Sequence, residues 1–211
     1  MVNKLLIYIH GKGGNAGEAE HYKPLFPDCD VIGFDYKSQM PWEFCKEFID
    51  KTDKLFCRYN NLILAANSIG AYFTMNALSA MKVNVHFTSK IRQAFFISPI
   101  VNMERLILDM MSWANVTEKQ LKEQKIVKTN FGENLSFEYL SYVRENPIDW
   151  NIPTKILYAE HDNLTSIETV TEFARKHNAQ LTVMPGGEHW FHTNEQMNFL
   201  DNWIKENYIN K

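Results

Sequence analysis

The sequence has few cysteines, and their spacing indicates no functional site. Its 211 residues include only three, Cys29, Cys45 and Cys57. These positions match no metal-ligand pattern, and an odd number argues against a closed disulfide framework. We therefore expect a protein of a reducing compartment that holds no metal and uses no cofactor.

Charge of one sign and long apolar runs are also scarce. The formal net charge is −3, and no run of five or more basic residues occurs. This pattern favours neither nucleic acid nor an anionic membrane as a partner. No apolar stretch approaches the ~20 residues that span a bilayer, and the first residues lack a signal-peptide cleavage region. We expect a soluble, cytoplasmic protein that binds a small molecule; the sequence carries no signal for its oligomeric state.

Short apolar runs recur along the whole chain. They cover residues 5–9, 31–34, 62–65, 94–97, 156–159 and 181–184. Continuous rather than alternating hydrophobicity is typical of parallel strands that are buried on both faces. Because helical patterns separate most of these runs, we predict a single α/β domain. It would be a three-layer α/β/α sandwich with a mostly parallel six-stranded sheet.

Two late helices carry start signals. Thr165 to Glu168 and Thr193 to Gln196 both fit the capping-box pattern. Apolar residues follow the second box at positions 199, 200, 203, 204 and 208. This stripe predicts a closing helix that packs against the sheet.

The segment between the fourth and fifth runs is too long for a simple crossover. Met103, Met110 and Met111 are among its apolar residues at helical spacing. We predict a helical insertion over residues 102–149 that covers one edge of the site. Its methionines would line an adaptable apolar pocket for substrate. The alternative is a long crossover helix with surface elaboration.

A serine lies where one apolar run gives way to a helical pattern. Residues 66–70 read Ala-Asn-Ser-Ile-Gly directly after the run 62–65. A sharp strand-to-helix turn around a serine is the nucleophile elbow. It needs small residues two positions before and after the serine, and Ala66 and Gly70 meet that need. Ser68 is therefore a candidate nucleophile; an ordinary helix N-cap is the alternative.

An acid and a base follow the serine in the order that such a nucleophile requires. Asp162 comes just after the run 156–159, and His189 lies in a glycine-containing loop after the run 181–184. Parallel strands end on one edge of the sheet, so both should meet Ser68 there. Competing candidates are Glu160 for the acid and His161 or His192 for the base.

The glycine-rich segment after the first run has two interpretations. Residues 10–14 read His-Gly-Lys-Gly-Gly, and such a loop offers backbone N–H groups to an oxyanion. We expect one donor from Ile69 and the other from Lys12, with Gly11 as the next choice for the second donor and as a substrate-binding residue. Residues 11–16, Gly-Lys-Gly-Gly-Asn-Ala, also match a dinucleotide-binding fingerprint, with Asp30 or Asp35 as the ribose acid. That alternative leaves the serine, the acid and the base unexplained.

Taken together, these motifs resemble the α/β-hydrolase superfamily over nearly the whole chain, from residue 10 to residue 191. The resemblance implies Ser68 as nucleophile, Asp162 as acid and His189 as base. It also implies that the insertion is a cap. The elbow departs from the family by opening with Ala66 in place of the commoner glycine.

The resemblance implies a serine hydrolase, most simply an esterase, that works through an acyl-enzyme. Trp190, beside the base, is a further candidate for contacting substrate. Thioesters, lactones, amides and carbon–carbon bonds are cleaved by the same machinery, and the superfamily names no substrate. Two alternatives remain: a non-catalytic binding protein of the same fold, and a dinucleotide-binding protein.

Overall fold

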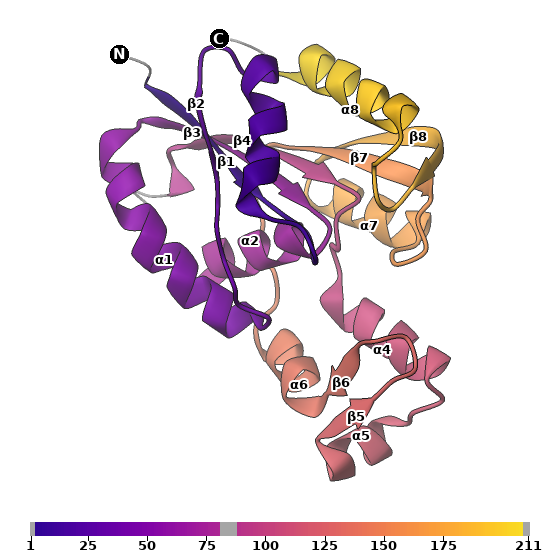
Figure 1. Ribbon diagram of the computed structural model, residues 1–211. Coiled ribbons are helices and arrows are strands. Elements are labelled where there is room, and N and C mark those ends of the chain that lie inside the picture. Colours follow the sequence, from indigo (N-terminus) through magenta and orange to yellow (C-terminus); the bar gives the residue numbers. More distant parts are fainter. Residues whose placement is uncertain (1–2, 81–87, 209–211) are drawn as a thin grey trace. The chain divides into compact units, whose positions relative to one another are not determined.

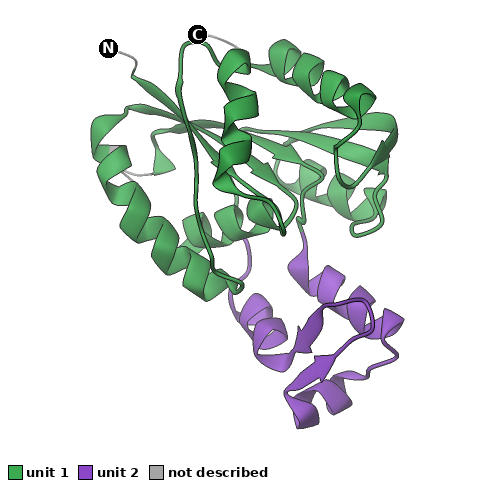
Figure 2. Ribbon diagram, in the orientation of Figure 1, with its two compact units in different colours: residues 1–101, 149–211 green, residues 102–148 purple. Residues whose placement is uncertain are grey.

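The computed structural model describes residues 3–80 and 88–208. It divides into two compact units, one formed by residues 1–101 and 149–211 and the other by residues 102–148 (Figure 2). The larger unit contains the central sheet and the three predicted catalytic residues.

The larger unit is built on a six-stranded sheet with the order β2-β1-β3-β4-β7-β8. Its strands are β1 Lys4–Ile9, β2 Asp30–Gly33, β3 Asn61–Asn67, β4 Ile91–Ile97, β7 Thr154–His161 and β8 Gln180–Glu188. Every neighbouring pair is parallel. The four central strands are largely buried on both faces, which accounts for their continuous apolar runs in the sequence. The predicted parallel six-stranded sheet is confirmed.

Helices cover both faces of this sheet (Figure 1). They are η1 Ala16–Leu25, a 3-10 helix, and the α-helices α1 Pro41–Arg58, α2 Ile69–Ala80, α7 Ile167–Lys176 and α8 Asn194–Asn207. Helices η1 and α8 share one apolar cluster with the sheet. On the other face α2 is buried all round from Gly70 to Leu78, because α1 packs against it.

The helix starts confirm one predicted cap and correct the other. Thr193 and Gln196 form the expected capping box of α8. At α7 the N-cap is Ser166, which accepts the backbone N–H of Thr169. Thr165 is displaced from the cap because its own N–H donates to Asp162 in the preceding turn.

The smaller unit is not purely helical. It contains α4 Met103–Trp113, α5 Glu118–Gln124 and α6 Phe137–Glu145, together with the strands β5 Ile126–Lys128 and β6 Asn134–Ser136. The two strands form an antiparallel hairpin, which the sequence analysis missed because each has only three residues. Arg144 joins the three helices by bonding Glu104 at 2.6 Å and Glu118 at 2.7 Å.

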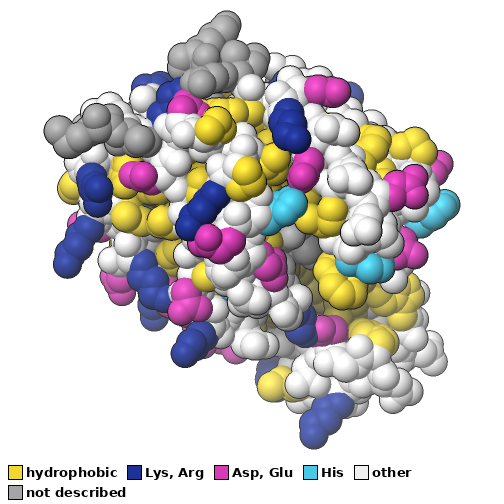
Figure 3. All heavy atoms as spheres, turned by 45° about the horizontal axis from the view of Figure 1, so that its top comes forward, with side chains coloured by type: hydrophobic (Ala, Val, Ile, Leu, Met, Phe, Trp, Pro, Cys, Tyr) yellow, Lys and Arg dark blue, Asp and Glu magenta, His cyan; other side chains and the backbone are white. Residues whose placement is uncertain are grey.

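The surface matches the mixed charge of the sequence. On the face shown in Figure 3, basic and acidic side chains are interspersed, with apolar side chains between them. Among the described residues, no helix combines the length and the apolar character that crossing a bilayer requires.

Candidate functional site

Ser68 occupies a strained turn between β3 and α2. Its φ of 50° lies in the left-handed region, which is unfavourable for residues other than glycine. The turn also brings α2 close to the end of β1. A Cβ on Gly70 would lie 2.4 Å from the carbonyl oxygen of His10 and 2.8 Å from that of Ile9. Only glycine fits at this position.

Backbone hydrogen bonds hold the strained serine in place. The Ser68 N–H donates to the carbonyl oxygen of Ile97 at 3.0 Å. The Ser68 carbonyl oxygen accepts the N–H groups of Ala71 and Ile100, each at 3.1 Å. The end of β4 and the first turn of α2 therefore fix the backbone from which the hydroxyl projects.

The structure brings Ser68, His189 and Asp162 into one line of hydrogen bonds. Ser68 Oγ lies 2.8 Å from His189 Nε2, and His189 Nδ1 lies 2.7 Å from Asp162 Oδ2. The Asp162 side chain is 0% exposed and that of His189 is 16% exposed. Because a carboxylate only accepts, Nδ1 carries the proton and Nε2 is free to accept the serine hydroxyl proton.

The second oxygen of Asp162 is also fully used. Oδ1 accepts the backbone N–H groups of Leu164 at 2.8 Å and Thr165 at 3.0 Å. These two bonds close a tight turn after β7 and aim the carboxylate at the imidazole. A buried carboxylate needs such donors, because burial without hydrogen bonds is costly. The sequence analysis did not identify these backbone donors.

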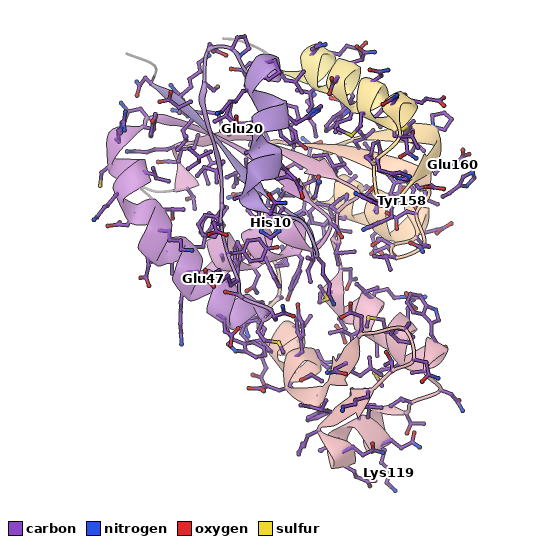
Figure 4. All side chains as sticks on the ribbon, in the orientation of Figure 1. His10, Glu20, Glu47, Lys119, Tyr158 and Glu160 are labelled. Atoms are coloured by element: carbon purple, nitrogen blue, oxygen red, sulfur yellow. The ribbon has the colours of Figure 1, made fainter. Side chains whose placement is uncertain are left out.

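Strands β7 and β8 both extend further than the apolar runs predicted. Asp162 directly follows β7, and His189 directly follows β8. Glu160 projects from β7 (Figure 4), and its Oε2 accepts the N–H of Gly186 at 2.7 Å. Gly186 has a φ of 66°, so this bond holds the glycine turn that leads to the histidine.

The competing residues make other contacts. Glu160 bonds to Gly186 and not to an imidazole. His161 is an exposed residue of β7, and His192 Nδ1 donates to the carbonyl oxygen of Trp190 at 2.7 Å. Asp162 and His189 are therefore the pair that meets Ser68.

The glycine loop after β1 runs beside the serine. A Cβ on Gly11 would lie 3.2 Å from Ser68 Cβ. The Gly11 carbonyl oxygen accepts Gly14 N–H at 3.2 Å and lies 2.8 Å from His10 Nδ1. In a trans peptide the following N–H points the opposite way, so that of Lys12 points away from these donors. Its role as an oxyanion donor, like that of Ile69 at the start of α2, stays a prediction.

The dinucleotide interpretation of this loop meets an unfavourable charge. Glu18 Oε1 accepts the N–H of Asn15 at 3.0 Å and would lie 2.6 Å from a Cβ on Gly14. A carboxylate therefore occupies the helix start where a pyrophosphate would bind. Asp30, a candidate ribose acid, instead accepts the hydroxyl of Tyr59 at 2.5 Å. The position of Glu18 could have been predicted from the sequence, because Asn15 and Glu18 have the spacing of a capping box.

Trp190 and three methionines of α4 are the remaining candidates for contacting substrate. Trp190 is 73% exposed and stacks on His192 with ring centroids 4.6 Å apart. Met103 and Met111 are buried and Met110 is half-buried in α4 of the smaller unit. A role for these residues in binding substrate stays a prediction.

Comparisons with known proteins give distant but extensive similarity. No model of a protein family matches the chain. It is 23% identical to "Putative esterase/lipase 3" of Mycoplasma genitalium over 91% of this chain and 80% of that protein. Est1E from Butyrivibrio proteoclasticus superposes with a TM-score of 0.72 at 14% identity, covering 96% of this chain and 86% of Est1E. A "Putative hydrolase" from Agrobacterium vitis S4 gives a TM-score of 0.75 at 14% identity, covering 97% and 87% of the two chains.

Proposed function

Because this chain has the α/β-hydrolase fold, we propose that it is a serine hydrolase that cleaves an ester or related acyl bond of a small molecule. The observation that carries the proposal is the line of two hydrogen bonds from Ser68 through His189 to Asp162. A nucleophile, a base and an orienting acid in contact at one sheet edge form the arrangement that acyl transfer needs. The similarity to a protein described as an esterase/lipase supports the same reaction class.

The first half of the reaction forms an acyl-enzyme. His189 Nε2 takes the hydroxyl proton while Ser68 Oγ attacks the carbonyl carbon, and the carbonyl oxygen becomes an oxyanion. The N–H groups of Ile69 and Lys12 bind that oxyanion. The tetrahedral intermediate then collapses, and the leaving alkoxide takes the proton from His189. Asp162 stays ionised throughout and stabilises the imidazolium.

The second half regenerates the enzyme. His189 removes a proton from water, and the resulting hydroxide attacks the acyl carbon bound to Ser68. The Ser68–acyl bond breaks, Ser68 Oγ recovers its proton from His189, and the carboxylic acid leaves. No metal or redox group is needed to balance these steps.

The reactivity of Ser68 tests this proposal directly. We expect a fluorophosphonate probe to label the wild-type protein and not the Ser68→Ala variant, because only an activated serine reacts. Hydrolysis of p-nitrophenyl acetate should be lost in the same variant while its circular dichroism stays that of the wild type. A non-catalytic binding protein would give neither labelling nor turnover. Esters and thioesters of graded chain length would then define the acyl group.

A further inference from the structure

Three polar side chains lie in line next to the apolar cluster beneath η1. Tyr8, near the end of β1, is 1% exposed and belongs to that cluster. Its hydroxyl donates to Glu18 Oε2 at 2.5 Å and accepts Asn67 Nδ2 at 2.9 Å. A phenylalanine at position 8 would fill the same space, so packing alone does not account for the hydroxyl.

The donors in this line all point the same way. Burial above all, together with neighbouring Tyr22 and the bond to Glu18, raises the pKa of Tyr8 well above its usual range, so the hydroxyl keeps its proton. The Glu18 carboxylate can only accept, so it takes that proton. Asn67 must then present its amide N–H₂ group to the tyrosine oxygen. The direction of the line, from Asn67 through Tyr8 to Glu18, is thereby fixed.

The two ends of this line adjoin the two segments that carry the proposed oxyanion donors. Asn67 is the residue before Ser68 and ends β3. At the other end, Glu18 Oε1 accepts the Asn15 N–H at 3.0 Å and lies against the backbone of Gly14. The elbow and the glycine loop are more than fifty residues apart in the sequence. Tyr8 joins them through two hydrogen bonds.

We propose that Tyr8 and Glu18 are positioning residues that fix the place of the glycine loop relative to Ser68. This inference rests on the proposed hydrolase activity. The loop carries one of the two predicted oxyanion donors, and such donors act only when they are aimed at the developing charge beforehand. Hydrogen bonds in an apolar surrounding are stronger than those in water. Because its middle member, Tyr8, is buried in the cluster, the line fixes the loop better than surface contacts would.

Tyr8→Phe is the decisive variant, and Tyr22→Phe is its matched control. Tyr22 is buried and stacks on Tyr8 with centroids 4.8 Å apart, but its hydroxyl is outside the line. Using p-nitrophenyl acetate, we expect Tyr8→Phe to lower kcat about ten- to hundredfold with KM changed less than about threefold. Affinity for a boronic acid that mimics the tetrahedral intermediate should fall in parallel with kcat/KM. Tyr22→Phe should stay near the wild type in all three.

Glu18 variants test the same line from its outer end. Glu18→Ala should reproduce the loss of kcat. Glu18→Gln should restore part of it, because its single oxygen accepts from Tyr8 or from Asn15 but not from both. Titration with the fluorophosphonate gives the fraction of active protein, by which each kcat is corrected. If Tyr8→Phe does not fold, the Glu18 variants test the positioning role in its place.

The outcomes separate the two proposals. Equal kcat and boronate affinity in Tyr8→Phe and Tyr22→Phe, with the wild type fully labelled by the probe, would overturn the positioning role alone. A wild-type protein that the probe does not label would remove the hydrolase and the positioning role together.

Discussion

Two serines at neighbouring strand ends share a backbone conformation and differ in the exposure and contacts of their side chains. Ser68 follows β3 with a φ of 50°, and Ser98 follows β4 with a φ of 41°. Ser68 is partly exposed and its hydroxyl contacts an imidazole. Ser98 is 1% exposed, and its hydroxyl oxygen is buried with no hydrogen-bond partner among the described residues. Left-handed strain at a sheet edge is therefore not a sign of a nucleophile by itself.

The residue two positions after each serine explains why the chain takes a different path at the two strand ends. Gly70 lets α2 pack against the end of β1, so the chain turns sharply at Ser68. Ile100 occupies the same place after Ser98 and donates its N–H back to Ser68. The segment after β4 therefore helps to hold the backbone at the end of β3. The two serines differ in what faces them: Ser68 meets His189, which follows β8 and contacts Asp162 after β7.

The largest expected effect comes from removing the acid that orients the base. Asp162→Asn should lower kcat about 10³–10⁴-fold, because the amide favours the wrong imidazole tautomer. Ser68 would then be nearly as inert as Ser98. Glu160→Gln is the matched control: it alters a carboxylate two residues away whose one contact in the described part of the site is the Gly186 N–H. The amide oxygen of glutamine can still accept this N–H, so activity should stay within about threefold. Steady-state kinetics would decide, and similar losses in both variants would refute the assignment of the acid.

A smaller effect is expected from filling the space that defines the elbow. Gly70→Ala should lower the free energy of unfolding by about 3 kcal/mol, because its Cβ meets the backbone of β1. Gly13→Ala offers a comparison, since a Cβ there meets nothing within 4 Å but φ is 78°. Its cost should be only about 1 kcal/mol. Urea unfolding measures both, and an equal cost would mean that strain and not close approach demands Gly70.

The smallest effect concerns the second serine. Ser98→Ala should raise the free energy of unfolding by about 1 kcal/mol, because it removes a buried hydroxyl that has no hydrogen-bond partner among the described residues. Activity should stay within about twofold of the wild type. Urea midpoints and p-nitrophenyl acetate turnover would be compared with the wild type. A clear loss of stability would show that the Ser98 hydroxyl is hydrogen-bonded in solution.

The predicted elements were recovered best where the signal was local. The run 62–65, the small residues around Ser68 and the start of α2 lie within twenty consecutive residues, and their pattern predicted the strand, the turn and the helix. The hairpin of the smaller unit was missed because three-residue strands leave no periodicity to detect. The α7 cap was assigned one residue early, because the competing bond from Thr165 to Asp162 is a tertiary feature.

The site shows the same division. Residue type, chain order and strand-end position predicted that Ser68, Asp162 and His189 would lie together, and the three are in hydrogen-bond contact. Their catalytic roles stay a prediction. The line from Asn67 to Glu18 was not foreseen, since it depends on which side chains face η1 from two adjacent strands. Only the contact between Glu18 and the Asn15 N–H could have been predicted, because these two residues have the spacing of a capping box.

By itself, the sequence determined the parallel α/β architecture and the three residues that its strand ends could present. Hydrophobic periodicity and small residues act over a few positions, so they can be read along the chain. Only the tertiary structure decided that Asp162 and not Glu160 faces the imidazole, and that Ser68 and not Ser98 meets a base. Which acid and which serine meet the imidazole depends on the order of strands in the sheet and on hydrogen-bond distances between residues far apart in the chain.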